Sequence, residues 1–198
     1  MQPTLNSNNA THFAEYSNKL QKLLATSSWS GVELLAHDLR RCWQQKRRVF
    51  ICGNGGSAGN AAHLENDFLY GVAKRIGGGL RVNALTANAA VITCLANDVG
   101  YDNIFSEQLA VQASQGDLVI ALSGSGNSPN ILKVLHQAKL MGVKSYAILG
   151  FSGGASKDLA DVAIHFPVND MQIAEDMQLI VGHMVMQWLH ENRPLEKS

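Results

Sequence analysis

The sequence predicts an α/β fold, in which a doubly wound parallel sheet of five strands forms the middle of three layers. Short apolar runs such as residues 118–122 alternate with longer segments of helical character from residue 48 onward. Continuous apolar strands are typical of a parallel sheet that helices cover on both faces. The loops richest in glycine and serine directly follow two of these runs. The carboxyl ends of parallel strands, where such loops lie, form the ligand-binding edge of this kind of sheet.

Two N-terminal helices are expected before the sheet. Residues 1–10 are polar and predict a loose tail, whereas the apolar spacing predicts helices over 11–25 and 30–45. Ser30 and Glu33 fit a capping box at the start of the second helix. We expect both helices to be packing surfaces, against the rest of the domain or against a second subunit.

The remaining elements follow in order along the chain. Strands are predicted over residues 48–52, 80–85, 118–122, 145–149 and 162–166. A helix should follow the first strand, and further helices are predicted over residues 88–97, 103–113, 129–141, 156–160 and 171–190. Ser128 is expected to cap the helix that Pro129 begins.

The bulk composition indicates a single cytoplasmic domain. The chain has 198 residues, with 16 Lys and Arg against 16 Asp and Glu, so its net charge gives no reason to expect nucleic acid or an anionic membrane as partner. The three cysteines are far apart and are expected to be reduced core thiols. No apolar run reaches the roughly 20 residues that a membrane-spanning helix needs, and the first ten residues lack a hydrophobic signal segment.

A glycine-rich loop, Gly53–Ala58, separates the first strand from its helix. Its glycines let backbone N–H groups approach a ligand, and the helix N-terminus attracts anions. The loop formally satisfies the dinucleotide-binding pattern GxGxxG/A, but the second strand ends Asn83–Thr86 without the acidic residue that this pattern requires. A Walker A loop is excluded because no Gly-Lys-Ser/Thr follows.

A second loop, Ser123–Ser128, offers three hydroxyl groups and two glycines between an apolar strand and the helix that Pro129 begins. Hydroxyl groups and free N–H groups of a helix N-terminus can bind phosphate oxygens without a lysine. A simple strand-to-helix turn needs one serine rather than three. We therefore predict a phosphate site here.

Four further residues could hold a metal ion. His63 and Asp67 are four residues apart and share a helix face, and Glu175 and His183 are eight residues apart, about two turns along the last helix. Two imidazoles and two carboxylates would suit a divalent metal such as zinc. Each pair alone is also typical of an ordinary surface or capping arrangement, so the spacing leaves the metal site open.

These motifs resemble the SIS (sugar isomerase) domain family and, within it, the bacterial phosphoheptose isomerases. The resemblance covers nearly the whole chain and depends on residues 52–57, His63 with its acid, 96–98, 102–106 and 123–128. It implies one SIS domain over residues 1–198 with a flavodoxin-like sheet. It also implies a homotetramer with active sites at subunit interfaces, where residues 1–46 are expected to form a helical extension.

The resemblance further implies an enzyme, an aldose–ketose isomerase of the cytoplasm. It would convert sedoheptulose 7-phosphate to D-glycero-D-manno-heptose 7-phosphate, a precursor of lipopolysaccharide heptose, or act on a closely related phosphosugar, with one zinc ion per subunit. The alternative is a non-catalytic protein of the family that binds sugar phosphates or regulates a partner. The four potential metal ligands favour the enzyme, because such proteins discard them.

Position by position, the resemblance implies three groups of residues. Substrate binding falls on Asn54, Gly55, Gly56, Ser57, Asn97, Asp98, Ser123, Gly124, Ser125 and Ser128. Metal binding falls on His63, Asp67, Glu175 and His183. For the reaction itself, Asp67 is the candidate base and His183 the candidate acid, and Glu175 is a rival base.

The chain departs from the family pattern at four positions. Asp67 stands where the family has Glu, Glu175 where it has Gln, Gly71 where it has Arg, and Gly124 where it has Thr. The first two changes keep oxygen ligands, so a metal site is still expected. The shorter acid and the added charge are expected to change the reach of the base, the position of the metal or the sugar that is accepted.

Overall fold

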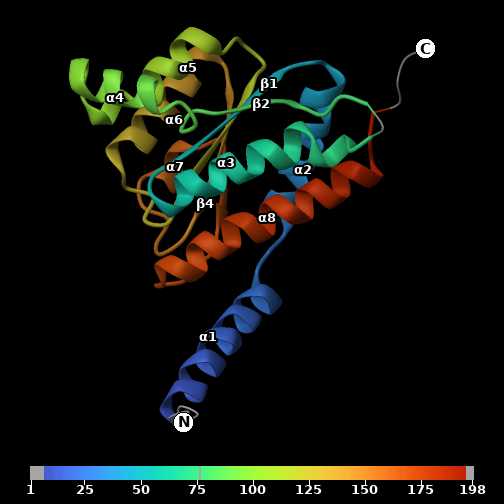
Figure 1. The fold of residues 1–198 in the computed structure, drawn as a ribbon, viewed down its shortest axis with the longest axis vertical. Coiled ribbons are helices and arrows are strands. Elements are labelled where there is room, and N and C mark those ends of the chain that lie inside the picture. The colour runs from blue at the N-terminus through green and yellow to red at the C-terminus, as the bar shows by residue number, and fades with distance from the viewer. Residues whose placement is uncertain (1–6, 76, 195–198) are drawn as a thin grey trace, which may run out of the picture.

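The computed structural model describes residues 7–75 and 77–194, and it has the predicted three-layer α/β architecture (Figure 1). Within these residues, five strands form one sheet in the order β2-β1-β3-β4-β5. The strands are β1 (Arg48–Gly53), β2 (Arg81–Ala84), β3 (Leu118–Ser123), β4 (Lys144–Leu149) and β5 (Val162–His165). All neighbouring pairs are parallel. The direction of winding reverses between β1 and β3, so the loops that follow these two strands lie beside each other at the ligand-binding edge.

Helices cover both faces of the sheet. The α-helices of the described residues are α1 (Ser7–Thr26), α2 (Ser30–Gln44), α3 (Gly56–Leu69), α4 (Ala89–Asp98), α5 (Ser106–Gln112), α6 (Pro129–Met141), α7 (Ser156–Leu159) and α8 (Met171–Glu191). Two short 3-10 helices complete the set, η1 (Gly71–Ala73) and η2 (Tyr101–Asn103). Among the described helices, none combines the length and apolar character needed to cross a membrane.

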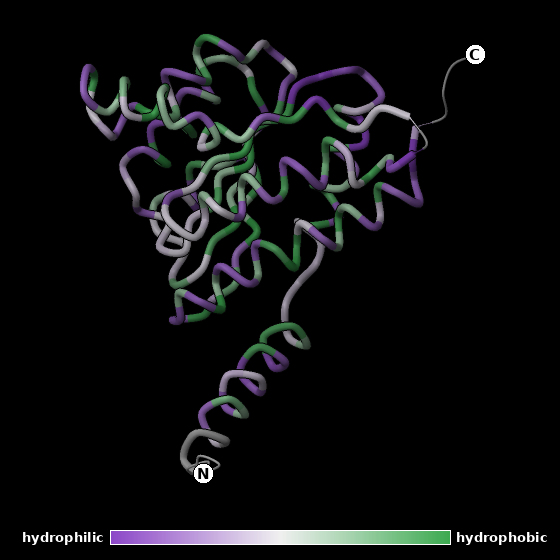
Figure 2. Tube along the Cα trace, in the orientation of Figure 1, coloured by the Kyte–Doolittle hydropathy of each residue, from purple (hydrophilic) through white to green (hydrophobic). Residues whose placement is uncertain are grey.

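The apolar residues of each strand alternate between two cores. Val49 and Ile51 pack in the core beneath α2, α3 and α8, whereas Phe50 and Cys52 pack in the core beneath α5 and α6. This period of two is the geometry of an extended strand. Figure 2 shows the resulting hydrophobic band along the strands at the centre of the molecule.

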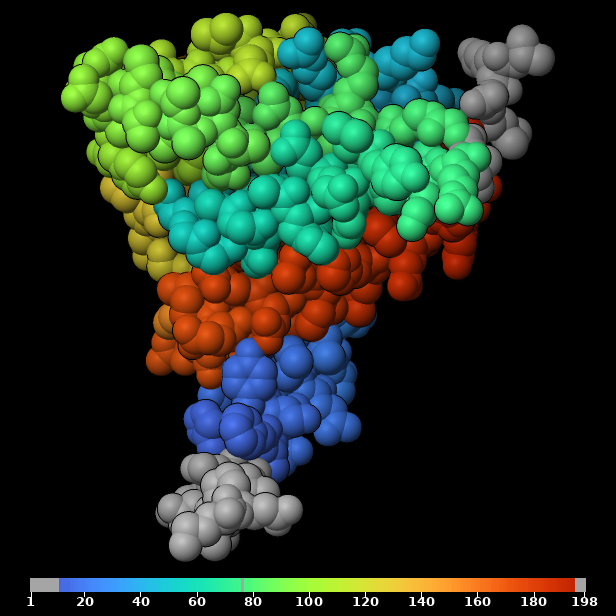
Figure 3. Space-filling view, in the orientation of Figure 1, coloured from blue at the N-terminus to red at the C-terminus, as the bar shows by residue number. Residues whose placement is uncertain are grey.

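Helix α1 projects away from the body of the molecule, beyond α8 (Figures 1 and 3). Midway along α1, the Tyr16 hydroxyl donates a hydrogen bond to Asp176 on α8, which raises the pKa of Tyr16 to about 12. Lys19 forms an ion pair with Asp170 at 2.8 Å. Much of α1 is nevertheless uncovered, and the Phe13 side chain is 71% exposed.

Several local predictions were wrong. Helix α1 already begins at Ser7, so only residues 1–6 of the predicted tail lie outside the described residues. The capping box is not formed, because Ser30 is the first helical residue and Trp29 occupies the capping position without a side-chain bond. Ser128 precedes α6 as predicted but makes no capping hydrogen bond. Cys94 is exposed, unlike the two buried cysteines.

Helices α3 and α8 run side by side across one face of the sheet (Figures 1 and 3). They approach closely at Gly182 of α8, where a Cβ atom would overlap the side chain of Leu64. Leu64 is buried, with 1% of its surface exposed. The hydrogen atom at Gly182 therefore sets the spacing of the two helices.

We expect Gly182→Ala to lower the free energy of unfolding by about 1–3 kcal/mol, because the added methyl group overpacks this contact. Gly59→Ala is the matched control, since a Cβ at Gly59 on α3 meets no atom within 4 Å. That control should be neutral or stabilising by up to about 1 kcal/mol through helix propensity. Urea unfolding followed by circular dichroism measures both, and equal stability of the two variants would contradict the packing assignment.

Candidate active site

The glycine loop after β1 and the serine loop after β3 enclose a pocket of about 250 Å³ at the predicted edge of the sheet. The lining residues are Asn54, Gly55, Gly56, Ser57, Leu122, Ser123, Gly124, Ser125, Ser128, Met171 and Glu175. Eight of the ten predicted substrate-binding residues are among them, together with Glu175. The pocket therefore joins two loops that are about 70 residues apart in the chain.

The serine loop keeps part of its hydrogen-bonding capacity for a ligand. The Ser123 hydroxyl accepts a bond of 3.0 Å from the backbone N–H of Gly126, and the Ser125 hydroxyl accepts one of 3.3 Å from Asn127. Ser128 has no partner for its hydroxyl among the described residues. Because accepting one bond leaves a hydroxyl free to donate, this loop presents donors next to the start of α6, where anions are favoured.

Gly124 has a neighbour that the sequence did not reveal. A Cβ atom at this position would overlap the sulfur of Met171 and lie 3.8 Å from the ring of Phe151. The methionine side chain therefore occupies the space that a threonine would need. A thioether therefore lines the pocket at this point, which makes this part of the wall less polar than a hydroxyl group would.

Asn54 is held by a reciprocal pair of amide hydrogen bonds. Its Nδ2 donates to Asn130 Oδ1, and Asn130 Nδ2 donates to Asn54 Oδ1, both at 2.9 Å. The Tyr101 hydroxyl donates to the same Asn54 oxygen at 2.9 Å. Asn130 is buried at the start of α6, so this pair connects the glycine loop with the serine-loop helix.

A buried side-chain network connects α3 and α8 beneath the pocket. Gln178, which is 1% exposed, donates from Nε2 to the Ser57 hydroxyl at 3.0 Å. Its Oε1 accepts a bond of 2.9 Å from Asn60, and Asn60 also donates to the backbone carbonyl of Glu175. Every polar group of this network that is buried finds a partner, which fixes the rotation of the two helices relative to each other.

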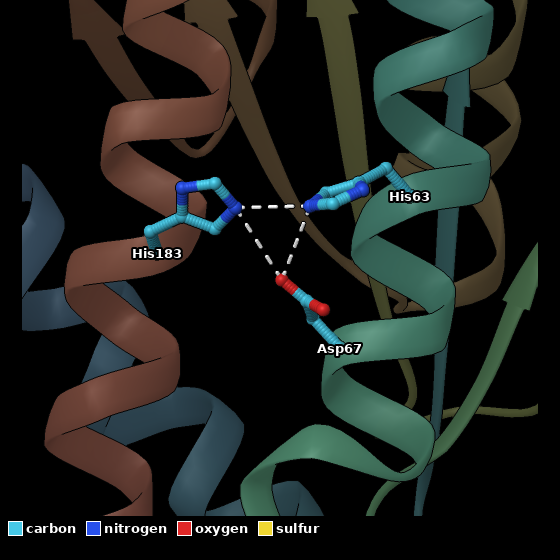
Figure 4. A group of neighbouring side chains, drawn as sticks. All are labelled: His63, Asp67 and His183. Atoms are coloured by element: carbon cyan, nitrogen blue, oxygen red, sulfur yellow. Dashed lines mark hydrogen bonds and ion pairs between the residues drawn. The ribbon is translucent and has the colours of Figure 1, made fainter.

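His63, Asp67 and His183 form a separate group farther along the same two helices (Figure 4). The two Nε2 atoms are 2.9 Å apart, and Asp67 Oδ2 lies 3.4 Å from His63 Nε2 and 3.5 Å from His183 Nε2. The three side chains converge from α3 and α8, and both imidazoles are about half exposed, at 48% and 47%.

This donor set fits a divalent metal ion. Ligand atoms that surround zinc tetrahedrally at about 2.0–2.1 Å are themselves about 3.3 Å apart, close to the three separations observed here. Three protein ligands also leave a fourth position for substrate or water, as in catalytic rather than structural zinc sites. The remaining Asp67 oxygen, Oδ1, has only a long hydrogen bond of 3.4 Å from Asn66.

Glu175 lies in the pocket and is not part of the three-residue group. Eight residues along a helix correspond to about 12 Å and a rotation of about 80°, so Glu175 and His183 point to different places along α8. Asn97 and Asp98 lie at the exposed end of α4, outside the pocket lining, with Asn97 donating to Asp98 at 2.8 Å.

Comparison with known proteins agrees with this geometry. Residues 12–150 match the SIS domain family. The phosphoheptose isomerase of Chlorobaculum parvum is 32% identical over 174 residues, which cover 87% of this chain and 83% of that protein. The phosphoheptose isomerase of Akkermansia muciniphila is 35% identical over 162 residues, 81% and 85% of the two chains.

Solved structures show the same architecture. The phosphoheptose isomerase of Neisseria gonorrhoeae superposes with a TM-score of 0.84 at 26% identity, covering 95% of this chain and all of that one. The enzyme from Francisella tularensis has the same fold, with a TM-score of 0.87 at 24% identity over 93% of this chain and 97% of that one. The chain is therefore a member of the SIS domain family, in the group of the phosphoheptose isomerases.

We expect Gln178→Leu to lower the free energy of unfolding by about 1–3 kcal/mol, because Ser57 and Asn60 lose a buried hydrogen-bond partner while the volume is kept. Gln172→Leu, an exposed position on the same helix, should change stability by no more than about 0.5 kcal/mol. Urea unfolding measures both variants. If Gln178→Leu is as stable as the control, the network does not hold the helices together.

Proposed function

We propose that this chain is an aldose–ketose isomerase that converts sedoheptulose 7-phosphate to D-glycero-D-manno-heptose 7-phosphate. The observation that carries the proposal is a pocket suited to phosphate between the glycine and serine loops, together with a His–Asp–His group on α3 and α8 that is suited to a metal ion. The chain also matches two proteins named phosphoheptose isomerase over 83% and 85% of their length.

The separation of the two groups supports a long sugar phosphate. His63 follows Gly56 by seven residues on α3, and His183 follows Glu175 by eight on α8, which corresponds to about 10–12 Å along each helix. An extended seven-carbon sugar with a terminal phosphate has a comparable length. A heptose phosphate held at the serine loop would therefore bring its carbonyl end to the histidines, whereas a triose phosphate would be too short.

The pocket residues are proposed to bind different parts of the substrate. Ser123, Ser125, Ser128 and the backbone of Gly124 bind the phosphate, because this loop supplies hydroxyl donors at the start of α6. The glycine loop, Asn54–Ser57, binds the sugar hydroxyls. Asn97 and Asp98 would complete the sugar site only in an oligomer that encloses the end of α4.

We propose that His63, Asp67 and His183 hold a divalent metal ion, with zinc as the best match to the donor set. When bound, such an ion would polarise the substrate carbonyl and favour the negative charge that develops on its oxygen. Glu175 is excluded from this ligand set in the proposal, because its carboxylate faces the pocket instead.

Asp67 is the proposed base and His183 the proposed acid. Asp67 takes a proton from C1 of the ketose and returns it to C2. The C2 oxygen would gain a proton from Nδ1–H of His183, the ring nitrogen that a metal at Nε2 leaves free, and the C1 hydroxyl would return one to it. Asp67 Oδ2 faces both histidines, so its other oxygen is the one available to the substrate. Glu175 is a rival base only for a sugar bound in the reverse direction, because its carboxylate lies in the pocket, about 12 Å along α8 from His183.

The chain is further proposed to form one SIS domain that assembles as a homotetramer in the cytoplasm and supplies a heptose precursor of lipopolysaccharide. An apolar groove between α2 and α8 supports a subunit interface, and Trp29, Met184 and Trp188 contribute to its lining. The uncovered α1 and the absence of fully buried residues on α4 among the described residues also support one. In this assembly, residues 1–46 would lie at the interface.

A panel of ketose phosphates with five, six and seven carbons, each incubated with the protein with and without zinc, tests the proposed activity. Product formation followed by NMR should be fastest with sedoheptulose 7-phosphate and should depend on the metal. Binding of that sugar without conversion under any metal condition would instead identify a non-catalytic sugar-phosphate-binding protein.

We expect His183→Ala to lower the affinity for Zn²⁺ by at least about tenfold, because one of three protein ligands is lost. Competition with a chromophoric chelator measures this without any need for turnover. His136→Ala, which removes an exposed histidine of α6, should leave the affinity unchanged. Equal zinc binding by the two variants would remove His183 from the metal site.

Asp67→Asn is expected to lower kcat by about 10²–10⁴-fold, the contribution of a positioned general base. Asp158→Asn on the exposed surface of α7 has the same loss of charge and should retain full activity. Zinc content is measured alongside, so that loss of the base can be distinguished from loss of the metal. Turnover that survives in Asp67→Asn would remove Asp67 from the base role. Glu175 would then be the candidate, with the carbonyl end of the sugar in the pocket.

A further inference from the structure

The carboxylate of Glu175 lies directly against the backbone of Gly56, the first residue of α3. A Cβ atom at Gly56 would overlap the carboxylate carbon and both of its oxygens. The start of a helix has unpaired N–H groups and the positive end of the helix dipole, so it ordinarily attracts a ligand anion. In this protein the attraction is met by the chain's own negative charge.

Glu175 is also available to a ligand. Its side chain is partly buried and lines the pocket, and among the described residues its carboxylate has no hydrogen-bond or ion-pair partner. An ionised carboxylate accepts hydrogen bonds and has no proton to donate. It would therefore accept bonds from sugar hydroxyls and repel a second anion.

The pocket does not compensate this charge. None of the described residues that line it is a lysine, arginine or histidine. In a space of about 250 Å³, two anions repel each other more strongly than in water because the surrounding dielectric is lower. The serine loop on the opposite wall is then the more favourable place for a phosphate, since it has hydroxyl donors and the start of a 13-residue helix.

We propose that Glu175 is a specificity-determining residue that excludes anions from the glycine loop. The pocket then accepts one phosphate group, at the serine loop, and a neutral hydroxyl-bearing chain beside Glu175. Ligands with a second anionic group close to the first phosphate bind poorly. This inference rests on the proposed function, since it takes the ligand to be a sugar monophosphate.

Glu175→Gln tests the proposal, because the change keeps the size of the side chain and removes its charge. Isothermal titration of the full-length, metal-loaded protein with inorganic phosphate should show about tenfold tighter binding by the variant. The preference for inorganic phosphate over pyrophosphate, which carries a second anionic group beside the first, should fall by a similar factor. Glu191→Gln removes the same charge from an exposed position on the same helix and should change neither value.

Unchanged or weaker phosphate binding by Glu175→Gln would overturn the proposal, as would an unchanged preference between phosphate and pyrophosphate. Glu175→Ala is measured in parallel, because it removes the same charge by truncation and should shift both values in the same direction even if the glutamine variant folds poorly. Failure of the unmodified protein to isomerise sedoheptulose 7-phosphate would refute the proposed activity instead. The phosphate titration does not depend on that result.

Discussion

The close packing of α3 against α8 is the constraint on which the rest of the site depends. Gly182 allows the two helices to approach at Leu64, and Gln178 fixes their rotation through Ser57 and Asn60. Apart from the serine loop and Asn97 and Asp98 of α4, every group with proposed chemistry is attached to one of these two helices or to the loop before α3. A change in their spacing would therefore alter the pocket and the His63–Asp67–His183 group together, because interiors are too closely packed to absorb it locally.

The two helices also give the site its direction. The pocket lies at their N-terminal ends, beside the serine loop, and the histidines lie about two turns farther along. A phosphate bound at one end and a carbonyl polarised at the other require a substrate of matching length. The negative charge of Glu175 lies at the pocket end, against Gly56, where the sugar hydroxyl groups nearest the phosphate would bind.

Much of this arrangement could be predicted from the sequence. The apolar runs predicted the five strands. The loops after β1 and β3 predicted the pocket, because the strands on either side of the switch point of a doubly wound sheet end next to each other. His63 and Asp67 followed from their four-residue spacing. Glu175 and His183 were both expected to be metal ligands, but a separation of eight residues rotates the helix by about 80°. Of the two, only His183 lies with His63 and Asp67.

Other features depended on contacts that a single sequence does not reveal. Met171 fills the space beside Gly124 only because α8 begins next to the serine loop. Nothing in the sequence marks Gln178 as special. In the packed structure it is buried and forms hydrogen bonds with Ser57 and Asn60. The predicted capping hydrogen bonds of Ser30 and Ser128 are also absent, because a serine near a helix start does not always cap the helix. Ser30 is itself the first residue of its helix, and within the described part of the chain the Ser128 hydroxyl is left free for a ligand.

The central claim is that one substrate spans both groups, with its phosphate on the serine loop and its carbonyl end at the histidines. A crystal structure of the zinc-soaked protein with sedoheptulose 7-phosphate, with the metal located by anomalous scattering, tests this most directly. The account predicts zinc between His63, Asp67 and His183, and the phosphate against Ser125 and Ser128. A phosphate at the start of α3, or a metal ion bound elsewhere, would contradict it.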